Sequence, residues 1–394
     1  MSAVAEAVVC KTGSQHDLIE RFPPDEFRHA EPNEGYLIMA ALLREGALAD
    51  VLTLNFDSAA RTALGRLGVG SRVSTVRRPE DYIHLGTHNL IYLHRDIDSD
   101  EDSLILRAKD LEKAWKERWE QVIAQRVLSG PVTVFVGIGS PASVLIDTTR
   151  RILAAIDKQA NVYVVDPIAH GDSVVATELN TPSKDYVCIG WGDFMEALAQ
   201  RLVEEHRASI QHECDELTKQ LGQKNEDVTE LCRRLAELGI LRLGKLRAAW
   251  LAEGSSYLPQ ESGTPLRLFG SLVLGVRAVE RISGHQATFG EEGVVEFSQD
   301  THITRVIVCS GGGWMTDARM ETELKKRQQA LRHRGITSAV ALVGGVDSSA
   351  SIAAPSDIVA DTDPYDLVTG SDHLRTFSLA ELRANPELAY EVVR

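Results

Sequence analysis

The fold is decided by residues 131–167, PVTVFVGIGSPASVLIDTTRRILAAIDKQANVYVVDP. The β-branched runs at its two ends, 131–139 and 161–167, predict buried strands, and each run closes on glycine or polar residues. The stretch between them has a helical pattern, so the segment predicts a strand–helix–strand unit. Because ligands bind at the carboxyl ends of the strands in such sheets, these polar ends are the place to look for chemistry.

The same alternation extends along the chain on both sides of this segment. Further runs rich in β-branched residues predict strands at 51–57, 89–95 and 185–190, and helical patterns occupy 32–46 and 104–130. Strands that alternate with helices predict an α/β fold with a Rossmann-like parallel sheet, covered by helices on both faces.

The second half of the chain begins with helices. The pattern stays helical over 194–251, and 254–265 has the composition of a linker. Strand and helix signals return at 304–313, 317–334, 338–345 and 356–361. We therefore expect three parts: an α/β domain over 1–205, a helical connector over 206–253 and a second, smaller Rossmann-like α/β domain over 266–394.

Composition argues against several classes of protein. The formal net charge of −15 opposes binding to nucleic acid, and the basic stretch 323–334 fits a solvated helix face. The chain has no run of about 18 apolar residues and no secretory signal, so we expect a cytoplasmic protein without a membrane partner. None of the five cysteines forms a CxxC pair, so we expect neither a metal site nor a disulfide framework.

Polar residues close two of the predicted strands. Asn55 and Asp57 end the strand at 51–57, where asparagine can orient a water or a ribose and where both residues also suit a turn. His94 lies at the end of the strand at 89–95 and is a candidate general base, with a hydrogen-bonded surface histidine as the alternative.

The strands of residues 131–167 supply candidate ligand-binding residues. Gly137, Gly139 and Ser140 follow PVTVFV (131–136) at the end of the first run, where glycines let the backbone approach a phosphate or ribose closely. Asp166 ends the next strand and can accept hydrogen bonds from ribose hydroxyls.

The block IGWGDF ends one more strand and starts a helix. Gly190 and Gly192 flank a tryptophan in this block, and Asp193 follows. Gly192 and Asp193 are candidates for cofactor binding, although Asp193 suits the N-cap of the helix slightly better.

Six blocks along the chain resemble successive blocks of the sirtuin family, in the same order. They are PN…LL (32–43), TLNFD (53–57), YLHRD (92–96), VFVGIGSPASV (134–144), VYVVDP (162–167) and IGWGDFMEAL (189–198). The resemblance implies a domain that binds NAD. It implies that Asn55 orients water and ribose, that His94 acts as the base or ribose partner, and that the glycine-serine and aspartate strand ends hold the nucleotide.

Two features favour the bacterial branch of this family that hydrolyses NAD in antiviral defence. The chain has no zinc-binding cysteine quartet, and Asn55 and His94 lie farther apart in sequence than in the protein deacylases. This branch implies an assembly, either a homo-oligomer or a complex with products of neighbouring genes. The helical segment agrees, because it carries more apolar positions than one small sheet domain needs.

One departure leaves an alternative open. The family begins with a strand and a Gly-Ala-Gly-x-Ser loop that clamps the pyrophosphate. The nearest candidate here is EAVVCKTGS (6–14), in which Gly13 and Ser14 follow a short predicted strand. The match is poor, so a catalytically degenerate scaffold or nucleotide-binding subunit remains the alternative to an NAD hydrolase.

The C-terminal part carries two glycine-rich strand ends. VIVCSGGGW (306–314) suits a phosphate loop or a tight turn. ALVGGVDSS (341–349) resembles the loop of ATP pyrophosphatases, with Gly344, Gly345, Asp347 and Ser348 matching. The third hypothesis is therefore a nucleotide-activating enzyme that uses this loop.

Overall fold

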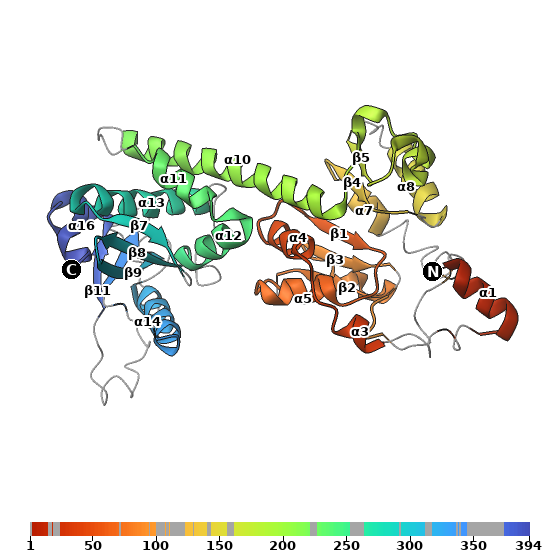
Figure 1. The fold of residues 1–394 in the computed structure, drawn as a ribbon, viewed down its shortest axis with the longest axis horizontal. Coiled ribbons are helices and arrows are strands. Elements are labelled where there is room, and N and C mark those ends of the chain that lie inside the picture. The colour runs from red at the N-terminus through yellow and green to blue at the C-terminus, as the bar shows by residue number, and fades with distance from the viewer. Residues whose placement is uncertain are drawn as a thin grey trace. The chain divides into compact units, whose positions relative to one another are not determined.

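A computed structural model describes most of the chain, in segments. The described residues are 2–14, 18, 24–70, 72–93, 95–99, 107, 110, 123–128, 130–139, 143–155, 161–220, 227–252, 264–290, 293–311, 317–335, 338, 340–344 and 374–394. The chain separates into two compact units, Met1–Ala199 and Gln200–Arg394, and each contains both helices and strands (Figure 1).

The first unit contains two small parallel sheets. One has the order β1–β3–β2, in which β3 (Asn89–Tyr92) lies between β1 (Asp50–Thr53) and β2 (Ser74–Val76). The single continuous sheet expected from the alternation is therefore not what the described strands form. The strand β2 is short and lacks a clear apolar run, and it pairs with β3 on the side opposite to β1.

The second parallel sheet of this unit has the order β4–β5–β6. It comprises β4 (Thr133–Val136), β5 (Val162–Val165) and β6 (Tyr186–Val187), all at predicted positions but shorter than the runs suggested. Both sheets contribute to one core, because Ile91 and Phe135 belong to the same cluster of buried residues.

The α-helices and the short 3₁₀ helices (η) of this unit follow in chain order. They are α1 (Ser2–Thr12), α3 (Pro24–Arg28), α4 (Glu34–Arg44), α5 (Ala59–Arg66), η1 (Pro79–His84), α7 (Gln125–Leu128), α8 (Ser143–Ala155), η4 (His170–Asp172), α9 (Val174–Glu178), η5 (Ser183–Asp185) and α10 (Trp191–Gln220). The predicted helix at 32–46 corresponds to α4, and the one predicted between the runs 131–139 and 161–167 corresponds to α8. Helix α10 begins in the first unit and ends in the second.

The prediction of a strand within residues 6–14 is wrong, because these residues belong to a helix and its C-terminal end. Helix α1 covers Ser2–Thr12, where alanines favour the helix, and Gly13 follows with a φ of 81°. The Gly13 N–H donates to the carbonyl of Val9 at 2.8 Å. Gly13 therefore terminates a helix, as glycine in the left-handed conformation commonly does.

The second unit has a five-stranded mixed sheet of order β11–β10–β9–β8–β7. Its strands are β7 (Gln286–Phe289), β8 (Val294–Gln299), β9 (His302–Ser310), β10 (Val340–Gly344) and β11 (Arg375–Ser378). Strand β8 runs antiparallel to both β7 and β9, whereas β10 runs parallel to both β9 and β11. The predicted strand at 356–361 lies outside the described residues.

Helices of the second unit share one core with this sheet. They are α11 (Thr229–Ala236), α12 (Gly239–Trp250), α13 (Thr264–Ser283), α14 (Asp317–His333), α16 (Leu379–Ala384) and α17 (Leu388–Val392). Leu231, Leu235 and Leu243 are buried in the same cluster as β9 and β10. These three positions of the helical segment therefore pack within the unit itself.

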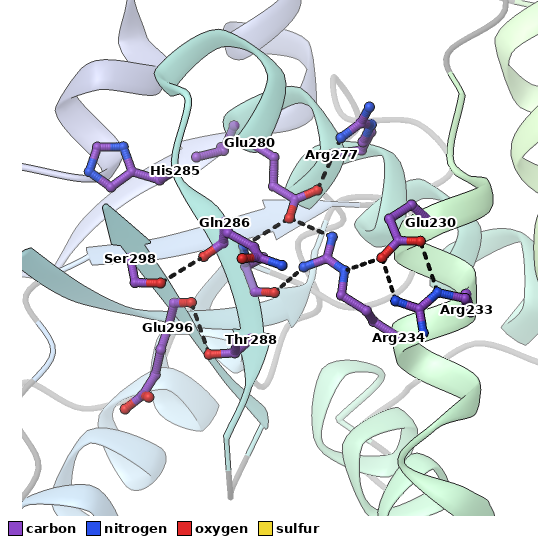
Figure 2. Close-up of polar contacts among 12 residues, drawn as sticks. Glu230, Arg233, Arg234, Arg277, Glu280, His285, Gln286, Thr288, Glu296 and Ser298 are labelled. Atoms are coloured by element: carbon purple, nitrogen blue, oxygen red, sulfur yellow. Dashed lines mark hydrogen bonds and ion pairs between the residues drawn. The ribbon is translucent and has the colours of Figure 1, made fainter. Parts of the chain in front are cut away.

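A buried ion pair ties α11 to α13 and β7 (Figure 2). Glu280 of α13 accepts a hydrogen bond from Arg234 Nη2 at 2.6 Å and one from Arg277 Nη1 at 3.3 Å. The Ala287 N–H of β7 donates to the same carboxylate at 2.8 Å, and Arg234 donates to the Ala287 carbonyl. The Glu280 side chain is only 5% exposed, so these contacts compensate a buried charge.

Within the described part of the chain, no helix is both long enough and apolar enough to cross a membrane.

Thiol reactivity should separate the five cysteines. Cys10 and Cys188 are exposed, whereas Cys214, Cys232 and Cys309 are buried, and burial raises the pKa of Cys232 and of Cys309 to about 11. At pH 8 a thiol reagent should therefore modify two cysteines quickly in the native protein and all of them after denaturation. Peptide mapping of the modified sites checks this result, and rapid native labelling of any buried cysteine would contradict it.

Candidate functional site

Asn55 lies at the carboxyl edge of the β1–β3–β2 sheet, two residues after β1 ends. Its backbone N–H donates to Thr53 Oγ1 at 3.0 Å, and its side-chain nitrogen donates to the Tyr36 hydroxyl at 2.7 Å. The residue is exposed. Helix α4, which carries Tyr36, therefore holds the Asn55 carboxamide at the strand end where ligands bind in parallel sheets.

Sequence reasoning missed Tyr36, which connects several parts of this site. The Asn33 side chain caps α4 by accepting from the Tyr36 N–H at 3.1 Å. Burial raises the pKa of Tyr36, the Asp57 carboxylate raises it further, and the bond from Asn55 lowers it. The phenol is therefore neutral at physiological pH, and its hydroxyl can both donate and accept a hydrogen bond.

Asp57 forms the turn that leads into α5. Its Oδ1 accepts from the Ala59 N–H at 2.9 Å, as in the Asx turns that aspartate favours after a strand. This contact fits the turn interpretation of Asp57, and its catalytic role stays a prediction.

His94 lies outside the described residues, but its two neighbours are described. The Leu93 N–H donates to the Thr53 carbonyl at 3.1 Å, which continues the pairing of β1 with β3. Arg95 has a φ of 72°, in the left-handed region that costs an ordinary residue about 1–2 kcal/mol. Strained residues of this kind cluster at functional sites, where the surrounding structure holds them in place.

A buried carboxylate holds the segment that follows. Asp96 is 1% exposed and accepts from Arg61 Nη1 at 2.9 Å and from Ser99 Oγ at 2.9 Å. Arg77 Nε lies 3.1 Å from Asp96 Oδ2, the same oxygen that Arg61 contacts. Asp96 thereby fixes the chain directly after Arg95, a role that its place in the motif YLHRD did not reveal.

The second sheet brings its predicted residues to one edge. Val136 pairs with Val165, so Gly137 and Asp166 are neighbours directly after β4 and β5, and the Gly137 N–H donates to the Val165 carbonyl at 2.9 Å. Gly137 has a φ of 63°, which requires glycine or a strained residue. A Cβ atom at Gly139 would meet no described atom within 4 Å. Ser140 lies outside the described residues.

Asp166 is 6% exposed and is bonded to the loop that follows it. Ser173 Oγ donates to Oδ2 at 3.2 Å, and the Ile168 N–H lies 3.4 Å from Oδ1. These bonds show that Asp166 orders the turn between β5 and α9. Contact with a ribose stays a prediction.

Asp193 does not cap α10, contrary to the favoured expectation. The helix begins at Trp191, so Asp193 lies inside its first turn, where a negative charge is favourable near the helix N-terminus. The Phe194 N–H donates to the Gly190 carbonyl at 3.0 Å. A Cβ atom at Gly192 would meet no described atom within 4 Å, so Gly192 leaves open space at this helix start.

Trp191 connects the block IGWGDF at the start of α10 with the site around Asn55. The sequence did not single out this residue. Its ring lies 5.9 Å from the Tyr36 ring, and a Cβ atom at Gly35 would lie 2.3 Å from the indole nitrogen. Through Tyr36, the start of α10 therefore meets Asn55. The signal in the sequence was a large aromatic residue between two glycines, in the block IGWGDF.

The glycines at the C-terminal strand ends are explained by packing where they are described. A Cβ atom at Gly311 would lie 2.3 Å from Val343 Cγ1, and one at Gly344 would lie 2.7 Å from Leu272 Cδ2. These contacts agree with tight turns and do not require a ligand. Gly345, Asp347 and Ser348 lie outside the described residues, so the nucleotide-activating hypothesis gains no support.

Among the described residues, no group of three or more histidine, cysteine, aspartate or glutamate side chains could hold a metal ion. The expectation that the protein needs no metal stays a prediction.

No protein-family model matches the chain, and no curated protein matches it. The resemblance to sirtuins therefore remains a hypothesis that depends on the order of the six motifs.

Proposed function

We propose that the first unit is a sirtuin-like, Rossmann-type domain that binds NAD and hydrolyses the bond between nicotinamide and ribose. Asn55 orients the attacking water and the ribose, and His94 serves as base or ribose partner. Gly137, Gly139 and Asp166 lie along the nucleotide, with Ser140, Gly192 and Asp193 as further contacts.

The observation that carries the proposal is the placement of Asn55. An exposed carboxamide stands at the carboxyl edge of a parallel sheet, held by a hydrogen bond from its nitrogen to Tyr36. The start of α10, with its two glycines, meets this same place through Trp191. Amide groups that are held in place suit the orientation of a reacting water.

The proposed reaction is a hydrolysis without a further co-reactant. The water oxygen forms a bond to C1′ of the ribose, and the C1′–nitrogen bond breaks. Its electron pair passes to the nicotinamide ring, which loses its positive charge. One proton passes from the attacking water to solvent, directly or by way of His94 where that residue acts as the base, and the products are nicotinamide and ADP-ribose.

The test is incubation of the purified protein with NAD, alone and together with the products of adjacent genes. Chromatography should show nicotinamide and ADP-ribose in equal amounts. NAD that remains intact in every mixture, at protein concentrations that saturate binding, would exclude the hydrolase.

We also propose that turnover occurs within an assembly that acts in antiphage defence. An unregulated hydrolase would exhaust the NAD of its own cell, so an inactive state has to dominate when the trigger is absent. A partner that binds only the competent state with about 2.7 kcal/mol of differential affinity would raise activity about 100-fold. Sedimentation with and without the neighbouring gene products tests this assembly.

A second candidate is a subunit that binds a nucleotide without cleaving it. One observation favours it: the segment nearest to a glycine loop, residues 6–14, belongs to helix α1 and its C-terminal end. Calorimetry that finds NAD binding without any products would select this candidate.

A further inference from the structure

We infer that Tyr36 is a positioning residue for Asn55, and that it holds the carboxamide so that its oxygen is available to the reacting water or ribose. The inference rests on the proposed function, because that function assigns Asn55 to the reaction.

The geometry selects which end of the carboxamide is used. Asn55 Nδ2 donates to the Tyr36 hydroxyl at 2.7 Å, across 19 positions of sequence. The described residues supply no hydrogen-bond donor to the Asn55 oxygen, and the residue is exposed. With the nitrogen engaged, the oxygen is the atom left to accept a hydrogen bond from a water or a ribose hydroxyl.

Tyr36 is the acceptor in this contact, because its hydroxyl oxygen receives the Asn55 N–H group. Burial raises the pKa of Tyr36, and the Asp57 carboxylate raises it further, so the phenol keeps its hydrogen at physiological pH. The oxygen of a neutral phenol has lone pairs that accept such a bond.

The Tyr36 ring is held by packing that does not involve its hydroxyl. Trp191 lies against the ring at a centroid distance of 5.9 Å, and Gly35 lets the indole approach α4 closely. The cap from Asn33 fixes the backbone at the same residue. A phenylalanine at position 36 should therefore keep the ring in place and remove only the contact with Asn55.

The first measurement is the kinetics of the Tyr36→Phe variant. We expect kcat for NAD cleavage to fall about fivefold, the effect of one lost hydrogen bond of ordinary strength, with KM changed by less than about twofold. The dependence of kcat on pH should keep its shape, because Tyr36 transfers no proton. The control is Tyr82→Phe, which removes a partly exposed hydroxyl from η1 in the same unit and should change neither constant.

The second measurement is independent of catalysis. Tyr36→Phe and Asn55→Ala should each raise the equilibrium constant of unfolding about fivefold. The double variant should also raise it only about fivefold, because both substitutions remove the same hydrogen bond. An increase of about 25-fold in the double variant would overturn the inference. An unchanged kcat in Tyr36→Phe would also overturn it, if the wild-type protein cleaves NAD. If wild type cleaves no NAD, the proposed function fails, while this cycle still decides whether Tyr36 holds Asn55.

Discussion

Replacing Glu280 with alanine should lower the free energy of unfolding of the second unit by about 3–5 kcal/mol, which corresponds to about 6–20 °C in Tm. The reason is that the largely buried Arg234 guanidinium would keep its positive charge without the carboxylate that compensates it. The Arg234 side chain is 13% exposed, and it would lose the carboxylate that lies 2.6 Å from its Nη2. The Ala287 N–H would also lose its acceptor. Urea unfolding followed by circular dichroism measures the loss.

The matched control is Glu237→Ala, in the same unit. Glu237 pairs with Arg233 on the surface, and its side chain is 58% exposed, so its removal should cost less than about 1 kcal/mol. Equal losses in the free energy of unfolding for Glu280→Ala and Glu237→Ala would show that the buried pair stabilises the unit no more than the exposed pair does. Glu280→Gln should fall between the two, because it keeps an acceptor for Ala287 and loses the charge.

The second large effect concerns catalysis. Asn55→Ala and His94→Ala should each reduce NAD cleavage by about 100-fold or more, while the fold remains intact. Asn55 is exposed and its side chain bonds to Tyr36, so its loss removes the group that orients the reactants with little loss of packing. Initial rates of nicotinamide release measure the effect, with circular dichroism as the check on folding.

A control for these variants is Asn180→Gly, since Asn180 is an exposed asparagine at a turn of the same unit, with a φ of 52° that glycine adopts without strain. Its cleavage rate should equal that of wild type. Full activity in both Asn55→Ala and His94→Ala would exclude this site and leave the binding candidate as the better account.

The sequence was most informative where strands are rich in β-branched residues. The runs at 131–139 and 161–167 became β4 and β5, because uninterrupted valines suit buried parallel strands. The strand β2 was missed, since three residues carry too little pattern to be recognised. The strands β7 and β8 were missed as well, because polar residues alternate with apolar ones along parts of both.

The candidate site was predictable only in part, and the reason is physical. The position of Asn55 follows from local pattern, because a polar residue after a strand stands at the sheet edge. The partners Tyr36 and Trp191 come from distant parts of the chain, and their contact depends on packing that no spacing encodes. The segment 6–14 was misread because two valines outweighed the alanines of α1.

The contact between Gly35 and Trp191 has an evolutionary consequence. Any side chain at position 35 would occupy the volume of the indole, since a Cβ atom would lie 2.3 Å from its nitrogen. Among descendants of a common ancestor the two positions should therefore covary, with larger residues at position 35 appearing only where position 191 has become smaller. Recombination between divergent relatives at any point between these positions would separate the compatible pair, and such chimaeras should be rare among natural sequences.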